Sequence, residues 1–237
     1  MRNGNTYYRG VRRGLGVGVG YFSVSFGFGA MAAAQGIRAL DATLISATNL
    51  TSAGQFAGLT LIVAGTTLWE LILTQLVINS RYALMSLALS QKMGADIGLL
   101  PRLFIAFFNT DEIFALAIAE RERLTTSFLL GLGTMPILGW TGGTLCGALA
   151  GSVLPMSIRT ALGVMLYGMF VAIVIPPARK ERPVLAVVGL ALVLSCIFAW
   201  VPGLKSVSAG ISIVICTVAA AAACAAVFPI PDEEVAA

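Results

Sequence analysis

The polar residues with the clearest chemical potential form one short run inside an apolar stretch. The run reads Thr48-Asn-Leu-Thr-Ser-Ala-Gly-Gln55, and it lies midway along the segment from Asp41 to Gly65. An unpaired polar group in hydrocarbon costs several kcal/mol, so these side chains are expected to face protein, water or a solute. A membrane helix with such groups and a glycine can unwind and offer its backbone to a solute. Alternatively, the hydroxyls and amides bond to a neighbouring helix. The first alternative makes these residues substrate-binding candidates: Asn49, Thr51, Ser52, Gly54 and Gln55.

A second candidate group is Asn79-Ser80-Arg81, within the third apolar stretch. An arginine at the centre of a membrane helix costs at least ~2.5 kcal/mol unless it reaches the interface or meets an anion. Arg81 lies too deep for easy access to the interface. Either it forms a structural ion pair, or it meets the carboxylate of a solute, with Asn79 beside it.

The third group is the pair Asp111-Glu112. Adjacent side chains on a helix point about 100° apart, so one of the two carboxylates faces a given cavity. Burial and a nearby cation shift the protonation of a carboxyl group in opposite directions, so the pair is a candidate for proton coupling. The alternative is a helix–loop boundary in interfacial water. Glu70, beside Trp69, is a weaker candidate.

The composition indicates an integral membrane protein. The chain is 58% hydrophobic and 11% charged, with mean hydropathy +0.91, whereas soluble domains carry roughly 25% charged residues. Its 237 residues accommodate about seven or eight spans of roughly 20 residues. We therefore expect an all-α polytopic bundle with one or more broken helices, forming a single transmembrane domain over 1–237.

Several chemistries have no sequence support. Histidine is absent, and the four cysteines form no CxxC pair, so neither a metal site nor a disulfide is expected. Gly27–Ala32 fits a loose dinucleotide fingerprint, but inside a bilayer-length segment rather than after a strand. There is no P-loop and no nucleophile elbow. We expect no enzyme and no cofactor. The net charge of +4 comes from basic residues at span ends, which predicts no nucleic-acid partner.

Eight apolar stretches set the expected topology: about 14–36, 42–65, 68–90, 103–119, 124–151, 160–177, 183–203 and 206–228. The start of the chain resembles a signal peptide, but we favour an uncleaved first helix that begins in the cytoplasm. Eight crossings then place three basic clusters on the cytoplasmic side, around Arg12, Arg121 and Lys180, as the positive-inside rule requires. The singletons fall opposite: Arg38, Lys92, Arg102, Arg159 and Lys205. If 103–119 re-enters instead, the count is seven and the C-terminus moves outside.

Glycines recur at every fourth position in two stretches. They are Gly139, Gly143, Gly147 and Gly151 in one, and Gly10, Gly14 and Gly18 in the other. Small residues at this spacing let helix backbones approach closely. They predict either tight packing or a sliding surface between moving helices.

The ordered motifs resemble those of the AzlC family of branched-chain amino acid transport proteins, the large subunits of bacterial exporters. The matching segments are Thr51–Ala57, Val77–Tyr82, Thr110–Ala115, Phe128–Gly131, Gly139-Trp140 and Gly143–Ala148, followed by Gly151 and Pro155. The resemblance covers roughly residues 10–175 and leaves C-terminal helices at 183–228. Two departures touch the expected solute path: Leu50–Gln55 differs from the common family pattern, and Tyr82 stands where many members have histidine.

The resemblance implies a multi-pass protein of the bacterial cytoplasmic membrane that exports branched-chain or similar hydrophobic amino acids. It also implies a small AzlD-type membrane subunit as partner. From the residues we expect a secondary transporter coupled to protons, and the alternative is a channel or a non-transporting scaffold for a small membrane protein.

Overall fold

The computed structural model describes residues 6–94, 97–151, 157, 171 and 174–229, and over these residues it contains helices and no strand. The all-α class is therefore confirmed. The helices whose bounds lie within the described residues are α1 (Tyr7–Ala34), α2 (Ala39–Thr48), α3 (Ser52–Val63), α4 (Leu68–Lys92), α5 (Leu99–Phe107), α6 (Asp111–Ile118), α7 (Thr126–Gly151), α9 (Arg182–Trp200) and α10 (Ala209–Val227), with a 3-10 turn at Leu204–Ser206.

The chain divides into two compact units. Unit 1 takes its described residues from Met1–Leu59 and Asn79–Leu166, and unit 2 from Thr60–Ile78 and Tyr167–Ala237. Helices α3 and α4 each contribute one part to either unit. All of the candidate site residues except the weaker candidate Glu70 belong to unit 1.

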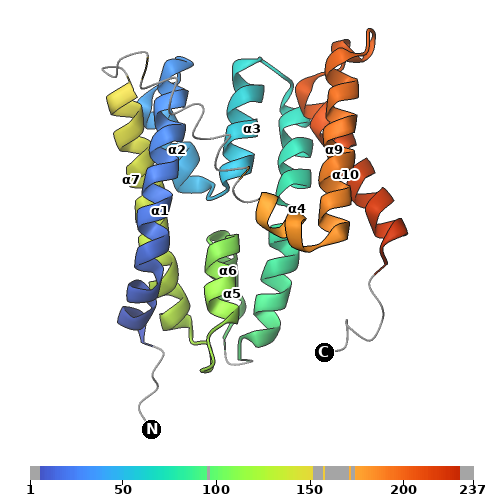
Figure 1. Ribbon diagram of the computed structural model, residues 1–237. Helices are drawn as coiled ribbons and strands as arrows, with labels where there is room; N and C mark the ends of the chain where they lie inside the picture. The colour runs from blue at the N-terminus through green and yellow to red at the C-terminus, as the bar shows by residue number, and fades with distance from the viewer. Residues whose placement is uncertain (1–5, 95–96, 152–156, 158–170, 172–173, 230–237) are drawn as a thin grey trace. The chain divides into compact units, whose positions relative to one another are not determined.

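Unit 1 is built on a close contact between α1 and α7. A Cβ added to Gly139 would lie 2.1 Å from the Gly18 carbonyl oxygen, and one added to Gly147 would lie 2.0 Å from that of Phe26. Nearer the other end, a Cβ on Gly10 would lie 2.2 Å from the Phe128 oxygen. The contacts advance in the same direction along both helices, so α1 and α7 are parallel (Figure 1). The tight packing that the glycine spacing predicts is confirmed.

The segment between α1 and α4 is a helical hairpin rather than a crossing. We call α2, the break at Asn49–Thr51 and α3 "hairpin A". The chain reverses at the break, and a hydrogen bond joins the two legs there. Gln55, in the first turn of α3, donates from Nε2 to Ser46 Oγ of α2 over 2.7 Å. Figure 1 shows the two legs running in opposite directions. At the open end of hairpin A, where α2 begins, Arg38 donates two hydrogen bonds of 2.7 and 2.9 Å to Asp41. These bonds lower the pKa of the Asp41 carboxyl.

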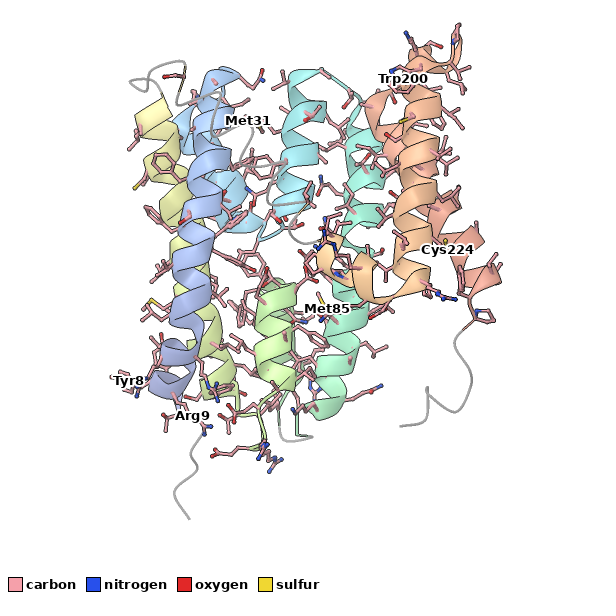
Figure 2. All side chains as sticks on the ribbon, viewed as in Figure 1. Tyr8, Arg9, Met31, Met85, Trp200 and Cys224 are labelled. Carbon is pink, nitrogen blue, oxygen red and sulfur yellow. The ribbon has the colours of Figure 1, made fainter. Side chains whose placement is uncertain are left out.

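A second hairpin follows α4. We call α5, the break at Phe108–Thr110 and α6 "hairpin B". Its outer end is fastened to the last turn of α4, where Lys92 Nζ donates to the carbonyls of Ala117 and Glu120 over 3.3 and 2.8 Å. Arg9 near the start of α1, labelled in Figure 2, pairs with Glu120 at 2.9 Å. Hairpin B thus opens toward the start of α1, whereas hairpin A opens toward the end of α1.

These hairpins change the expected count of crossings. Legs of 8 to 12 residues are about 12–18 Å long, too short for a hydrocarbon layer of about 30 Å. The stretch 42–65 therefore re-enters where a crossing was expected, and 103–119 takes the re-entrant alternative. Among the described residues, five helices are long and apolar enough to span: α1, α4, α7, α9 and α10. The expected stretch 160–177 lies largely outside those residues.

Candidate functional site

The two hairpin breaks are connected through side chains of α1 and α7. Gln55, only 2% exposed, accepts a hydrogen bond of 2.5 Å from Trp140 Nε1. Ser46, which binds the other end of the Gln55 amide, also lies 2.6 Å from the Thr144 hydroxyl. Both polar ends of Gln55 are thus engaged by protein. This part of the polar run fastens hairpin A to α7, as the helix–helix alternative predicts.

From Trp140 the connection continues to hairpin B through Tyr21. The two rings pack edge to face with centroids 5.3 Å apart. The Tyr21 hydroxyl lies 2.7 Å from Thr110 Oγ1 and also hydrogen-bonds Oε2 of Glu112. We call the connected set of Ser46, Gln55, Trp140, Tyr21, Thr110 and Glu112 the "central relay". It joins both breaks to the α1–α7 pair.

An ion pair lies beside the second break. Arg81 Nη1 is 2.8 Å from Asp111 Oδ2, and both side chains are 45% exposed. The guanidinium also lies over the Tyr82 ring, 4.9 Å from its centroid. Arg81 is near the middle of the 25-residue α4, a depth at which lipid contact is unfavourable for both charges. The pair therefore faces a polar space or another protein surface.

The helix ends at the breaks supply opposite partial charges. Helices α3 and α6 begin there, and α2 and α5 end there. The first N–H groups of a helix lack acceptors within it and carry partial positive charge, while the last carbonyls carry partial negative charge. Helix α6 has Asp111 and Glu112 in its first turn, but the first turn of α3 holds no acidic residue. There the Thr51 hydroxyl caps the Gly54 N–H, at 3.2 Å.

Asn109 adds a buried polar group to the second break. Its side chain is 2% exposed, and Nδ2 donates to Ser86 Oγ over 3.1 Å. Its Oδ1 has no hydrogen-bond partner within the described residues. A buried acceptor in that state costs about 1–3 kcal/mol, so it favours a donor from water or a solute.

Most of the predicted site residues meet around the breaks. Asn49 and Thr51 form the first break, and Ser52 and Gly54 begin α3. Arg81, Asp111 and Glu112 gather at the second. Asn79 lies on α4 two residues before Arg81, partly buried, with interactions of its own.

Sequence reasoning missed the residues that join the breaks. Tyr21, Ser46, Trp140 and Thr144 lie in apolar or glycine-rich runs, where one polar group does not stand out. Trp140 was part of a matched motif, and this was the available signal. Within the described residues, no group of three or more His, Cys, Asp or Glu side chains suited to a metal ion occurs.

Known proteins share this sequence pattern. The family model described as "AzlC protein" matches residues 16–154, more than half of the chain. An uncharacterized membrane protein of Archaeoglobus fulgidus is 33% identical over 74% of this chain and 77% of its own length. Inner membrane protein YgaZ of Escherichia coli (strain K12) is 27% identical over 75% of either chain. No solved structure matches.

The matched region contains both hairpins and most of α1 and α7, so it includes the central relay and the Arg81–Asp111 pair. These relatives and the five apolar helices make the chain a multi-pass membrane protein. The chain belongs to the AzlC protein family.

Proposed function

We propose that this protein is a secondary transporter that exports branched-chain or similar hydrophobic amino acids across the cytoplasmic membrane. The observation that carries the proposal is the half-exposed Arg81–Asp111 pair at the middle of a bilayer-length helix. Ionisable groups at this depth ordinarily line the path of a polar solute, because lipid does not accommodate them. The name of the Escherichia coli relative supports an inner-membrane location.

The charge pattern at the breaks suits an amino acid, which carries one carboxylate and one ammonium group. The start of α3 carries the partial positive charge of a helix N-terminus, and no acidic side chain in its first turn offsets that charge. This helix end therefore favours the carboxylate. Hairpin B offers the open acceptor Asn109 Oδ1, which favours the ammonium. Arg81 provides a second group for the substrate carboxylate, which would replace Asp111 as the partner of Arg81. The aliphatic side chain then packs on apolar neighbours of the breaks such as Leu50 and Ile113.

We further propose that Asp111 and Glu112 provide the coupling. An exporter without a nucleotide site must draw on an ion gradient. A substrate carboxylate that displaces Asp111 from Arg81 would leave Asp111 unpaired, which favours its protonation. A small AzlD-type subunit is the proposed partner, and it would cover part of the polar face that the ion pair presents.

The test is transport by the purified chain, with and without the small subunit, in proteoliposomes. Vesicles preloaded with unlabelled leucine should accumulate external labelled leucine by exchange, with saturable kinetics. Arg81→Ala should abolish this exchange, and Arg38→Ala, which removes an exposed ion pair at the mouth of hairpin A, should not. Conduction of leucine without exchange would instead indicate a channel. No movement with either composition would contradict transport and favour a scaffold.

A further inference from the structure

Unit 2 contains a buried carboxylate that lies away from the hairpin breaks in the sequence. Glu70, in the first turn of α4, is 8% exposed. Its Oε1 accepts a hydrogen bond of 2.9 Å from the backbone N–H of Gly210, at the second residue of α10. Within the described residues no ion pair includes Glu70, so its charge is offset there only by the helix end.

Two hydroxyls within four residues of the Glu70–Gly210 contact lack hydrogen-bond partners among the described residues. Thr74 lies one turn after Glu70, is 0% exposed, and its Oγ1 has no hydrogen-bond partner within the described residues. Ser208 occupies the N-cap position of α10, yet it makes no side-chain capping bond, and its buried Oγ is also without a partner there. Glu70 takes the N–H group that a serine cap ordinarily satisfies.

Gly210 provides the space for this arrangement. A Cβ added there would lie 2.6 Å from Glu70 Cγ, 2.7 Å from Glu70 Oε1 and 2.8 Å from Thr74 Oγ1. The carboxylate oxygen and the open hydroxyl thus both lie within 2.8 Å of one point that a side chain would fill. Glycine inside a helix costs about 1 kcal/mol relative to alanine, and α10 is otherwise rich in alanine. The close approach accounts for the glycine.

We propose that Glu70, Thr74 and Ser208 bind a sodium ion at the start of α10. Before the ion binds, the Glu70 carboxylate contributes one negative charge and the helix end contributes about +0.5. The group therefore carries net negative charge and attracts a monovalent cation. Carboxylate and hydroxyl oxygens suit a small hard cation, whereas calcium takes six to eight oxygen ligands, several of them from carboxylates. Simple capping uses one carboxylate oxygen and leaves Thr74 and Ser208 open. The ion engages all three side chains and fastens α4 to α10 within unit 2.

The experiment is thermal unfolding of the purified full chain in detergent, at equal ionic strength in sodium, potassium or choline chloride. A ligand that binds only the folded state raises its free energy of unfolding by RT ln(1 + [L]/Kd), so sodium should raise Tm by several degrees relative to choline. An equal Tm in all three salts, or an equal rise with potassium, overturns the proposal. This measurement requires no transport, so it stands or fails independently of the proposed export.

The variants identify the ligands. Glu70→Gln keeps the shape and removes the charge, and Thr74→Val removes one hydroxyl. Either should lower the apparent sodium affinity at least tenfold. The matched controls are Glu181→Gln and Thr217→Val, which change an exposed carboxylate and an exposed hydroxyl of the same unit. They should leave the apparent sodium affinity unchanged. If Glu70→Gln does not fold, Thr74→Val decides the outcome. A sodium response retained by the folded variants overturns the assignment.

Discussion

Whether Arg81 serves mainly Asp111 or mainly a solute is open to a quantitative test. Both partners are 45% exposed, so solvent screens their interaction. Exposed ion pairs contribute about 0.2–1 kcal/mol, which corresponds to less than about a fivefold effect. A hydrogen bond from a charged group to a substrate carboxylate contributes about 1.5–3 kcal/mol, or roughly 10- to 150-fold in affinity. The two roles therefore differ in magnitude.

The perturbation is a double-mutant cycle over Arg81→Ala and Asp111→Ala. For each variant, leucine exchange in proteoliposomes and Tm are measured. We expect Arg81→Ala to weaken apparent leucine affinity by at least tenfold. Removal of Asp111 as well should restore part of the Tm and none of the affinity. Arg81→Lys should recover little, because it lacks the planar fork that holds a carboxylate.

The matched control is the cycle over Arg38→Ala and Asp41→Ala, an exposed pair of similar length. It should change exchange less than twofold. If Arg81→Ala costs less than fivefold, or if the double variant exchanges leucine as the wild type does, Arg81 is a structural partner of Asp111 and does not hold substrate.

Three further perturbations test the central relay, the proton coupling and the α1–α7 contact. Gln55→Ala should lower stability by about 1–3 kcal/mol, since it leaves the buried Trp140 N–H unpaired; an unchanged Tm with an unchanged exchange rate would argue against the relay. Glu112→Gln should abolish proton-driven export yet preserve leucine exchange, and uphill export at the normal rate would show that Glu112 does not couple. Gly139→Ala places a Cβ 2.1 Å from a backbone oxygen of α1, so Tm should fall by several degrees. Gly142→Ala, with open space around it, should have no such effect, and equal Tm values for the two variants would contradict the α1–α7 contact.

The sequence predicted where the polar groups lie but not the path of the backbone around them. The segment 42–65 has the length of a crossing, and nothing local distinguishes a broken crossing from a hairpin. That choice depends on which neighbour satisfies the polar run. Here Trp140 and Thr144 do so, and both are far away in sequence.

The distribution of basic residues contained a signal for the hairpins. Eight crossings place Lys92 and Arg102 opposite the basic clusters, whereas two hairpins return them to the same end of unit 1 as Arg9 and Arg121. Among the described residues of unit 1, Arg38 is then the only basic residue at the other end. The positive-inside rule thus fits the hairpin topology better than the eight crossings that we expected from it. Partners in the ion pairs, such as Glu120 for Arg9, depend on three-dimensional contacts that no spacing rule predicts.

The parallel pairing of α1 and α7 has a consequence for synthesis. Tyr7 and Thr134, which share a hydrogen bond, are 127 positions apart. At about 5–20 residues per second, α1 waits about 6 to 25 s in the membrane before its partner emerges from the ribosome. During that interval its glycine face lacks the α7 backbone on which it packs. Both hairpins are made before α7, whose side chains anchor them, so unit 1 assembles only after nearly all of it has been translated.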